Sequence, residues 1–236
     1  MQEKYEEEYV KQEKKNAWFV ERKNLVYSLL KNVRKDASIL EIGCGSGYIL
    51  DHLQKNGFKK VSGVDSSKGF LKYYKNISKS TKLVVKKNAY DVILLLDVIE
   101  HVKKEDEILR KIQTMLKSQG TLLISAPAYQ FLWSHHDELN QHYRRYTKGM
   151  LRKALARNNF SIERMTYWNS IMLLPIFIIK KLQNIRKSKA SNMETMPTWS
   201  NGIYKLLLKI ENTVVRTGIN LPFGVSVFAI AKKNQR

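Results

Sequence analysis

The sequence predicts an α/β protein with a doubly wound, mostly parallel seven-stranded sheet. Between residues 36 and 125, short apolar segments typical of strands alternate with amphipathic segments typical of helices. This alternation is the pattern of a parallel sheet with crossover helices. One strand-like segment, YDVILLL at residues 90–96, is almost continuously apolar, as expected for a strand that is buried on both faces.

Each element follows from its local pattern. Residues 4–31 place apolar side chains at three- and four-residue steps among charges, which predicts one or two N-terminal helices. Gly57 and Gly120 follow helical patterns and are expected to end them. Region 168–220 also looks helical, with breaks at Pro175 and Pro197. The predicted strands are 36–42, 60–65, 82–86, 90–96, 121–125, 160–166 and 225–231, and the predicted helices of the core are 48–57, 67–76, 105–116 and 148–158.

Four parts are expected along the 236 residues. They are an N-terminal helical cap at 1–35, a core at 36–167, a helical insertion at 168–220, and the last strand with a basic tail at 221–236. The single cysteine excludes a disulfide framework within one chain. The first residues lack an apolar signal region, and the apolar stretch at 171–179 is too short to span a membrane. A cytoplasmic location is predicted, with peripheral binding to the inner face of the membrane as an open alternative.

The net charge is +21, from 42 Lys and Arg against 21 Asp and Glu. The excess lies at residues 24–90 and 151–236, whereas residues 91–150 carry eight bases and eight acids. A nucleic-acid module would show a continuous basic stripe with interleaved aromatic residues. Nucleic acid is therefore a less expected partner than an anionic membrane surface or a small-molecule acceptor, and a solvated Lys-rich surface is the plain alternative.

A glycine-rich turn follows the first core strand. Gly43, Gly45 and Gly47 form a G-x-G-x-G pattern that runs into a helix, and Asp65 closes the next strand. Glycines allow a ligand to approach the backbone, and the helix N-terminus offers unpaired N–H groups. A carboxylate after the second strand can accept two hydrogen bonds from a ribose diol. The alternative for Asp65 is a cap on the following helix.

Four motifs in order resemble the class I S-adenosylmethionine-dependent methyltransferases, which have a Rossmann-like fold. They are ILEIGCGSGYIL at 39–50, GVDS at 63–66, DVILLLDVIEHV at 91–102 and LKSQG at 116–120, and the resemblance covers residues 20–166. It implies an enzyme that uses S-adenosylmethionine, with Asp65 on the ribose and with Asp97 and Val98 facing the sulfonium. The family's adenine-contacting acidic residue and longer loop have no counterpart, and Asn88 is expected to bind adenine instead. The full set of implied cofactor-binding residues is Glu41, Gly43, Cys44, Gly45, Gly47, Asp65, Ser66, Asn88, Asp97 and Val98.

Four of the five histidines lie between residues 101 and 142. Their main segment, FLWSHHDELNQHYRRYT at 131–147, follows the fifth strand, at the edge where open α/β sheets bind ligands. His136 or His142 could act as a base, and Asp137 could orient it. Arg144 and Arg145 could clamp an anion. The alternative is a structural His and Arg network that anchors this segment.

The HDExxxHYRRYT pattern, together with LPFGVSVFAIAKK at 221–233, resembles the quinone-pathway O-methyltransferases. The resemblance implies that the histidine segment covers an acceptor pocket. Tyr129, Phe131 and Trp133 would then form its apolar wall, or they are plain core aromatics.

A D-x-x-E-H cluster is formed by Asp97, Glu100 and His101. It is similar to the E-x-x-E-H cluster of the small-RNA terminal 2′-O-methyltransferases, in which a divalent metal activates ribose hydroxyls. By that resemblance His136 or His142 would complete the ligand set. The same residues also end the fourth strand in many metal-free methyltransferases, so the favoured prediction is a protein without a metal.

The predicted insertion begins with WNSIMLLPIFII at 168–179 and continues into several lysines. This order suits a helix at a membrane interface, and the alternatives are a lid over the acceptor pocket or a dimer interface. We therefore expect a methyltransferase that O-methylates an amphipathic small molecule or a lipid-linked acceptor, such as a quinone precursor or glycan. The alternatives are an RNA ribose methyltransferase with a divalent metal and a non-catalytic cofactor-binding regulator.

Overall fold

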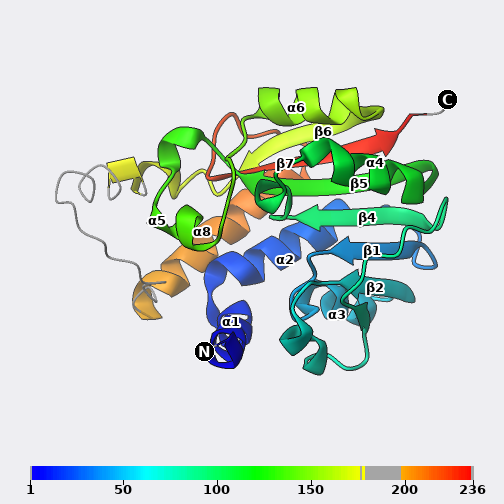
Figure 1. Ribbon diagram of the computed structural model, residues 1–236. Coiled ribbons are helices and arrows are strands. Elements are labelled where there is room, and N and C mark those ends of the chain that lie inside the picture. Colours follow the sequence, from blue (N-terminus) through cyan, green and yellow to red (C-terminus); the bar gives the residue numbers. More distant parts are fainter. Residues whose placement is uncertain (1, 176, 179–197, 235–236) are drawn as a thin grey trace.

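A seven-stranded sheet with the order β3-β2-β1-β4-β5-β7-β6 organises the described part of the chain (Figure 1). The computed structural model describes residues 2–175, 177–178 and 198–234. Strand β7 is antiparallel to both of its neighbours, and the other pairings are parallel. The predicted mostly parallel sheet is confirmed. The strands are β1 (Ser38–Ile42), β2 (Lys60–Val64), β3 (Ser78–Ser80), β4 (Tyr90–Leu96), β5 (Leu116–Pro127), β6 (Phe160–Trp168) and β7 (Ser226–Lys233).

Helices cover both faces of this sheet. The α-helices are α1 (Gln2–Lys15), α2 (Ala17–Leu29), α3 (Tyr48–Lys55), α4 (Glu105–Met115), α5 (His135–Leu139), α6 (Lys148–Arg157) and α8 (Thr198–Arg216). Three short 3₁₀ turns are η1 (Lys68–Lys72), η2 (Ile99–His101) and η3 (Gln130–Leu132). The carboxyl ends of β1 and β4 point toward the side of the molecule where α1 and α5 lie (Figure 1).

Strand β4 shows how the two faces are filled. Ile93 and Leu95 belong to the apolar cluster that contains side chains of α4 and α6. Leu94 and Leu96 belong to the opposite cluster, with side chains of α2, α3 and α8. Because successive side chains of a strand point to opposite faces, a strand in the middle of two helical layers must be apolar throughout. The YDVILLL segment is therefore apolar because the strand is buried on both faces, as predicted.

The expected cap and insertion share one helical layer, because α8 packs along α2 (Figure 1). The buried Asn212 amide donates to the backbone carbonyl of Glu21 at 2.9 Å and to its carboxylate at 3.0 Å. At the other end of the pair, the Asn201 side chain accepts a hydrogen bond from the N–H of Ala17 at 2.9 Å. Helices α2 and α8, from opposite ends of the chain, thus cover the same face of the sheet together.

Three local predictions were wrong. The third strand is 78–80 rather than 82–86, and the expected helix at 67–76 is the short turn η1. The Lys79 ammonium in β3 donates to the carbonyls of Ser46 (2.6 Å), Phe70 (2.9 Å) and Tyr73. These tertiary bonds, of which the one to Ser46 is long-range in sequence, override local propensity and hold the turn against the sheet. Gly120 lies inside β5 instead of ending a helix.

No helix among the described residues is long and apolar enough to cross a membrane. Residues 176 and 179–197, which include Pro197 and several lysines of the expected insertion, lie outside the described residues.

Candidate active site

The glycine loop lies at the carboxyl end of β1. Gly43, Gly45 and Gly47 have φ angles of +77°, +51° and +96°, which side chains of L-residues rarely allow. A Cβ atom on Gly43 would lie 2.3 Å from Cγ2 of Val98. The spacing of the three glycines thus serves both the turn and a close approach to the end of β4. Cys44 is buried beneath the loop, and burial raises the pKa of its thiol, which makes it a packing residue.

Asp65 joins the glycine loop to the end of β2. Its carboxylate accepts hydrogen bonds from the N–H groups of Gly45 at 2.7 Å and Ser67 at 2.9 Å. The bond to Ser67 closes a local turn before η1 and does not cap it, and the bond to Gly45 ties the two loops together. Each carboxylate oxygen can accept a further bond. Ser66 is exposed between them.

The end of β4 carries an ion pair that the sequence analysis missed. Asp97, with a φ of +53°, lies 2.8 Å from the guanidinium of Arg22 and accepts from the Ser125 hydroxyl at 3.0 Å. Arg22 comes from α2, is buried, and stacks 4.9 Å from the ring of Trp18. Its only signal in the sequence is a base inside an otherwise apolar helix face.

Buried carboxylates surround Arg22. Burial raises the pKa of Glu41 to about 8 and the pKa of Glu13 to about 7, and in both cases Arg22 partly opposes the effect. Burial also raises the pKa of Glu100, with the nearby charge of Asp97 adding to it. One oxygen of Glu41 has no hydrogen-bond partner among the described residues. A site rich in buried carboxylates is suited to a cationic ligand.

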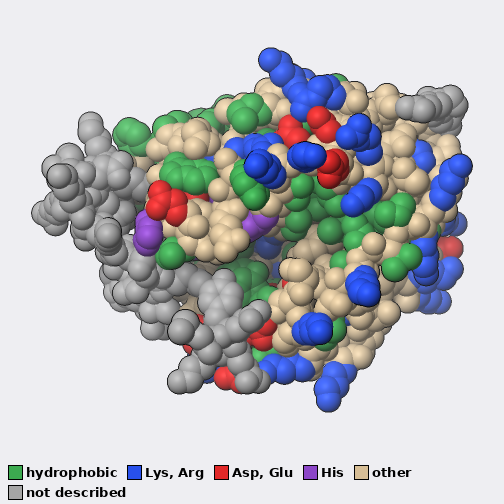
Figure 2. All heavy atoms as spheres, in the orientation of Figure 1, with side chains coloured by type: hydrophobic (Ala, Val, Ile, Leu, Met, Phe, Trp, Pro, Cys, Tyr) green, Lys and Arg blue, Asp and Glu red, His purple; other side chains and the backbone are tan. Residues whose placement is uncertain are grey.

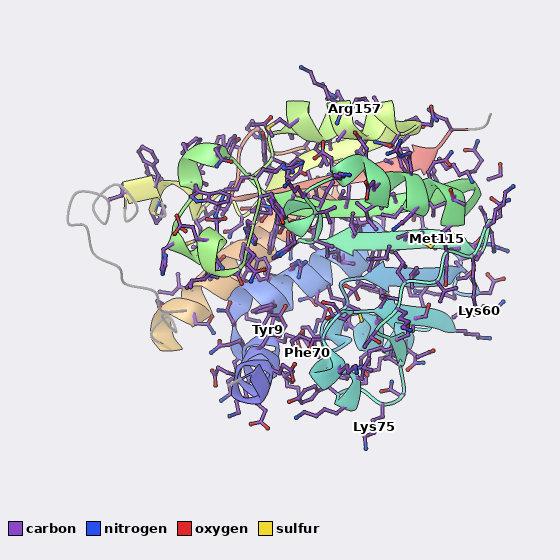
Figure 3. All side chains as sticks on the ribbon, in the orientation of Figure 1. Tyr9, Lys60, Phe70, Lys75, Met115 and Arg157 are labelled. Carbon is purple, nitrogen blue, oxygen red and sulfur yellow. The ribbon has the colours of Figure 1, made fainter. Side chains whose placement is uncertain are left out.

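Helix α1 lies over this site. Glu13 accepts a hydrogen bond from the Ser46 hydroxyl of the glycine loop at 2.5 Å, and Glu6 accepts one from the Ser67 hydroxyl. Tyr9 of α1 and Phe70 of η1 lie close together (Figure 3), and their ring centroids are 5.4 Å apart. The sequence predicted a helix here but not that its acidic residues bind the two loops.

The histidine segment is built around Asp137, whose side chain is fully buried. It accepts bonds from Arg145 Nε (2.8 Å) and Nη2 (2.9 Å), from the Ser134 N–H (2.8 Å), and contacts His142 Nδ1 at 2.9 Å. Burial by itself would raise the pKa of the Asp137 carboxyl, but the bonds from His142 and Arg145 outweigh it and hold that pKa well below its ordinary value. The same network anchors the segment and orients His142.

The other predicted residues of this segment lie apart from that network. His136 is exposed, and its Nε2 contacts the amide of Asn140 at 3.0 Å within and just beyond α5. Arg144 donates to Glu105 at 3.1 Å and to the carbonyl of Lys103 at 2.6 Å. The structure therefore brings together Asp137, His142 and Arg145, whereas His136 contacts its neighbour Asn140 and Arg144 contacts the region before and at the start of α4.

Glu100, His101 and His142 form a second cluster, with possible ligand atoms within 4.8 Å of one another. The loop is pinned there because the Tyr143 N–H donates to the Glu100 carbonyl at 2.7 Å. Asp97 is outside this set, since it binds Arg22 and Ser125. In Figure 2, histidine side chains reach the surface at two places on this face, one of them near its centre.

The aromatic residues of the predicted pocket wall form a stack. Tyr129 stacks on Phe131 at 5.1 Å and on Tyr167 at 5.0 Å, and Phe131 meets Phe177 edge-on at 5.8 Å. Phe131 is 60% exposed. Tyr129 and Phe131 thus lead from the core to an open apolar surface, whereas Trp133 is half-buried.

Asn88 lies at the opposite edge of the sheet from the glycine loop. It precedes β4, its N–H donates to the carbonyl of Thr114 at 3.0 Å, and its side chain accepts from Lys233 at 3.1 Å. Because the third strand is 78–80, residues 81–89 form the return connection to the amino-terminal edge. An adenine contact would have to come from the other end of this connection.

The residues present fit S-adenosylmethionine, which carries a sulfonium and an ammonium group. Positive-φ glycines allow a ligand close to the backbone, Asp65 follows β2 where a carboxylate could accept hydrogen bonds from a ribose diol, and buried carboxylates suit a positively charged group. Sheet order, glycine loop and acidic residue together define a class I S-adenosylmethionine-dependent methyltransferase fold. The chain belongs to the methyltransferase domain family, whose match covers residues 12–164. This confirms the predicted family and its cofactor.

Known proteins agree with this assignment. A ubiquinone biosynthesis O-methyltransferase of Pelagibacter ubique is 30% identical over 107 residues, which are 41% of this chain and 42% of that protein. The chain thus matches less than half the length of that relative. A SAM-dependent methyltransferase from Archaeoglobus fulgidus has the same fold, with a TM-score of 0.63, 16% identity, and coverage of 95% of this chain and 99% of that chain. A Haemonchus contortus phosphoethanolamine N-methyltransferase 2 in complex with S-adenosyl-L-methionine has a TM-score of 0.56 and 16% identity, over 90% of this chain and 52% of that one.

Proposed function

We propose that the protein transfers a methyl group from S-adenosylmethionine to an oxygen of an amphipathic small molecule or lipid-linked acceptor, such as a quinone precursor or glycan. One observation carries this proposal: Glu100 and His101, in the turn that follows Asp97 and Val98 after β4, gather with His142 of the histidine segment. The residues predicted to face the cofactor therefore lie next to side chains that can bind a proton.

An oxygen acceptor explains why ionisable groups gather there. Bound S-adenosylmethionine supplies an electrophilic methyl group, and a hydroxyl that attacks it must lose a proton. The cluster supplies the groups that promote this loss. Asp137 binds Nδ1 of His142, which orients the ring and leaves Nε2 as its other polar atom. Val98 packs on Gly43 of the glycine loop.

The aromatic stack favours an acceptor with an apolar part. Tyr129, Phe131 and Phe177 form a continuous set of ring contacts beside the histidine segment. A quinone precursor has an aromatic ring and an apolar tail, and the printed name of the Pelagibacter relative fits such an acceptor. The comparisons support neither the RNA ribose methyltransferase nor the non-catalytic regulator.

The same surface suggests where the enzyme meets a lipid-linked acceptor. Ile171, Leu174, Phe177 and Ile178 expose between 39% and 65% of their surface. Apolar side chains of this kind enter the headgroup region, and the overall charge of +21 favours anionic lipid. Co-sedimentation with phosphatidylglycerol vesicles tests this docking. Leu174→Ser should weaken binding and Val84→Ser, a similarly exposed site, should not; equal binding by both variants contradicts a docking surface at this region.

Methyl transfer is tested with labelled S-adenosylmethionine and a panel of catechols, polyprenyl-linked quinone precursors and glycans, with products identified by mass spectrometry. His142→Ala should abolish O-methyl product while cofactor affinity stays within about twofold. His135→Ala is the matched control, because His135 is an exposed histidine of α5 paired with Glu138. Loss of product in both variants, or label found on nitrogen or carbon, would contradict the proposal.

A further inference from the structure

We propose that Lys79 is a positioning residue for the cofactor. Its ammonium group holds the glycine loop and the loop after β2, residues 65–73 (the η1 loop), in the arrangement that binds S-adenosylmethionine. Lys79 is the middle residue of β3, the short edge strand of the sheet, and it lies outside all of the sequence motifs. The inference goes beyond the proposed function, because it concerns the cofactor and does not depend on the acceptor.

The ammonium group of Lys79 has a full set of backbone acceptors. It donates to the carbonyl of Ser46 in the glycine loop at 2.6 Å, to that of Phe70 at 2.9 Å, and to that of Tyr73. Phe70 lies in η1, and Tyr73 directly follows it. Since an ammonium group has three N–H donors, each of them can bind one carbonyl. One side chain therefore joins two loops that come from different parts of the chain.

The two loops also meet through Asp65, the residue predicted to bind the ribose. Its carboxylate accepts from the N–H of Gly45 at 2.7 Å. Its own N–H donates to the carbonyl of Ser80, the neighbour of Lys79 in β3, at 3.0 Å. Strand β3 thus holds this region twice, through a side chain and through the backbone. A shift of either loop would move the Asp65 carboxylate relative to the glycine loop.

Gly47 shows how closely the lysine lies against the glycine loop. A Cβ atom at this position would be 3.4 Å from Cδ and 3.6 Å from Nζ of Lys79. Gly47 is also the residue at which α3 begins, and its φ is +96°. The lysine stem therefore packs on bare backbone at the point where the loop becomes a helix.

A charged side chain is a costly choice for a contact that only stabilises the fold. Lys79 is half-buried, and burial lowers the pKa of its ammonium group, while the charges of Glu13 and Asp65 act in the opposite direction. Desolvated charges often stabilise proteins no better than well-packed apolar residues do, and in some proteins they specify one geometry. A lysine at this position is explained if cofactor binding requires one geometry of the two loops.

The size of the expected effect follows from the population of that geometry. Without the ammonium group the three carbonyls lose a charged donor, so the arrangement with both loops in place becomes less populated. The apparent dissociation constant of a ligand rises by the inverse of the population that can bind it. Loss of hydrogen bonds to a charged group corresponds to a change of about 10- to 100-fold.

Lys79→Met is the main test, because it keeps an unbranched side chain and removes the charge. The full-length variant is titrated by calorimetry with S-adenosylmethionine and, separately, with S-adenosylhomocysteine, which lacks the methyl group and the sulfonium charge. Both dissociation constants should rise by the same factor, about 10- to 100-fold. Lys75→Met is the matched control, because Lys75 is exposed and points away from the molecule (Figure 3). Its affinities should stay within about twofold of the wild type.

Lys79→Arg is the second variant, and it keeps the charge that the fold needs if Lys79→Met does not fold. The donors of a planar guanidinium cannot converge on three carbonyls from a single atom. Lys79→Arg should therefore bind both ligands more weakly than the wild type, with an unchanged circular dichroism spectrum. A residue that only stabilises the fold would lower the unfolding temperature and leave the affinities of the folded protein unchanged.

Two outcomes overturn the inference. Wild-type cofactor affinity in folded Lys79→Met, or in Lys79→Arg where the first variant does not fold, shows that Lys79 only stabilises the edge of the sheet. Unequal changes for the two ligands show that the ammonium group acts on the charge of the cofactor and not through the loops. Because no acceptor is used, failure to find a methylated product contradicts the proposed function and leaves this test unaffected.

Discussion

The glycine loop and the histidine segment lie at the same edge of the sheet but are built in different ways. The glycine loop is a backbone device: three positive-φ glycines, with N–H groups held by Asp65 and by the carbonyl of Val64. The histidine segment is a side-chain device, in which one buried carboxylate of Asp137 gathers a histidine and an arginine. Substitutions in the glycine loop are restricted because there is no room for side chains. Substitutions in the histidine segment are restricted because each buried charge needs its partner.

This difference predicts how each region fails. The glycine loop should tolerate changes around it but not a Cβ atom on its glycines. The histidine segment depends on Asp137, whose loss leaves its partners buried with their charges. The same comparison separates the predicted binding residues from the proposed chemistry, since the predicted cofactor-binding residues come mostly from the first region and the candidate acceptor groups from the second.

Asp137→Ala should have the largest effect on stability. It leaves the Arg145 guanidinium, which is 7% exposed, without its carboxylate. Breaking a buried ion pair in this way costs about 3–5 kcal/mol. Urea unfolding followed by circular dichroism measures the change. Glu138→Ala is the matched control, because this exposed neighbour pairs with His135 and its removal should cost within about 0.5 kcal/mol. Equal effects of the two variants would contradict the side-chain account.

Gly43→Ala tests the backbone device. The new Cβ would lie 2.3 Å from Val98 on a residue with a φ of +77°. Left-handed strain of about 1–2 kcal/mol and overpacking of about 1–3 kcal/mol add up to a cost of about 2–5 kcal/mol. S-adenosylmethionine affinity, measured by calorimetry, should fall at least tenfold.

Gly202→Ala is the control for that variant. A Cβ on Gly202 in α8 meets nothing within 4 Å, so the change should stabilise the helix by about 0.5–1 kcal/mol and leave cofactor affinity unchanged. If both variants bind the cofactor like the wild type, the glycine loop does not contact it.

The two regions also differ in how much of their structure the sequence predicts. Strand β4 at 90–96 and the glycine loop were foreseen because both depend on local patterns, apolar continuity and glycine spacing. The roles of Arg22 and Lys79 were not, because their partners Asp97 and Ser46 lie far along the chain. The third strand was misplaced for the same reason: the apolar 82–86 looked more like a strand than Ser78–Ser80. Within the histidine segment, spacing named Asp137 and His142 but could not tell His142 from His136.

Helix α1 makes the glycine-loop region sensitive to pH. The folded protein raises the pKa of Glu13 from 4.5 to about 7 through burial. The protonated form is favoured in the folded state, so its contribution is fully present below about pH 4.5 and is lost as pH rises through 7. The contact of α1 with the glycine loop should therefore weaken between about pH 4.5 and 7.

Glu13→Gln should remove this dependence. Hydrogen exchange of the α1 amides should become faster between pH 5 and 7 in the wild type, after correction for the intrinsic rate, and stay constant in the variant. Glu41 has a pKa raised to about 8, to which the charge of Glu13 contributes, so it titrates above the pH range in which Glu13 is followed. Glu8→Gln, on the exposed side of α1, should behave like the wild type. A wild-type profile in Glu13→Gln would show that another group controls the helix.

Asn88→Gly should have the smallest effect, and it sharpens the assignment of the cofactor side. The variant keeps the φ of +50° without strain and loses a bond to Lys233. Because Asn88 lies at the amino-terminal edge of the sheet, S-adenosylmethionine affinity should stay within about twofold of the wild type. The adenine would then be contacted from the carboxyl end of β3, where Thr81 begins the return connection. A large loss of affinity in Asn88→Gly, with the fold unchanged by circular dichroism, would instead place adenine against the connection before β4.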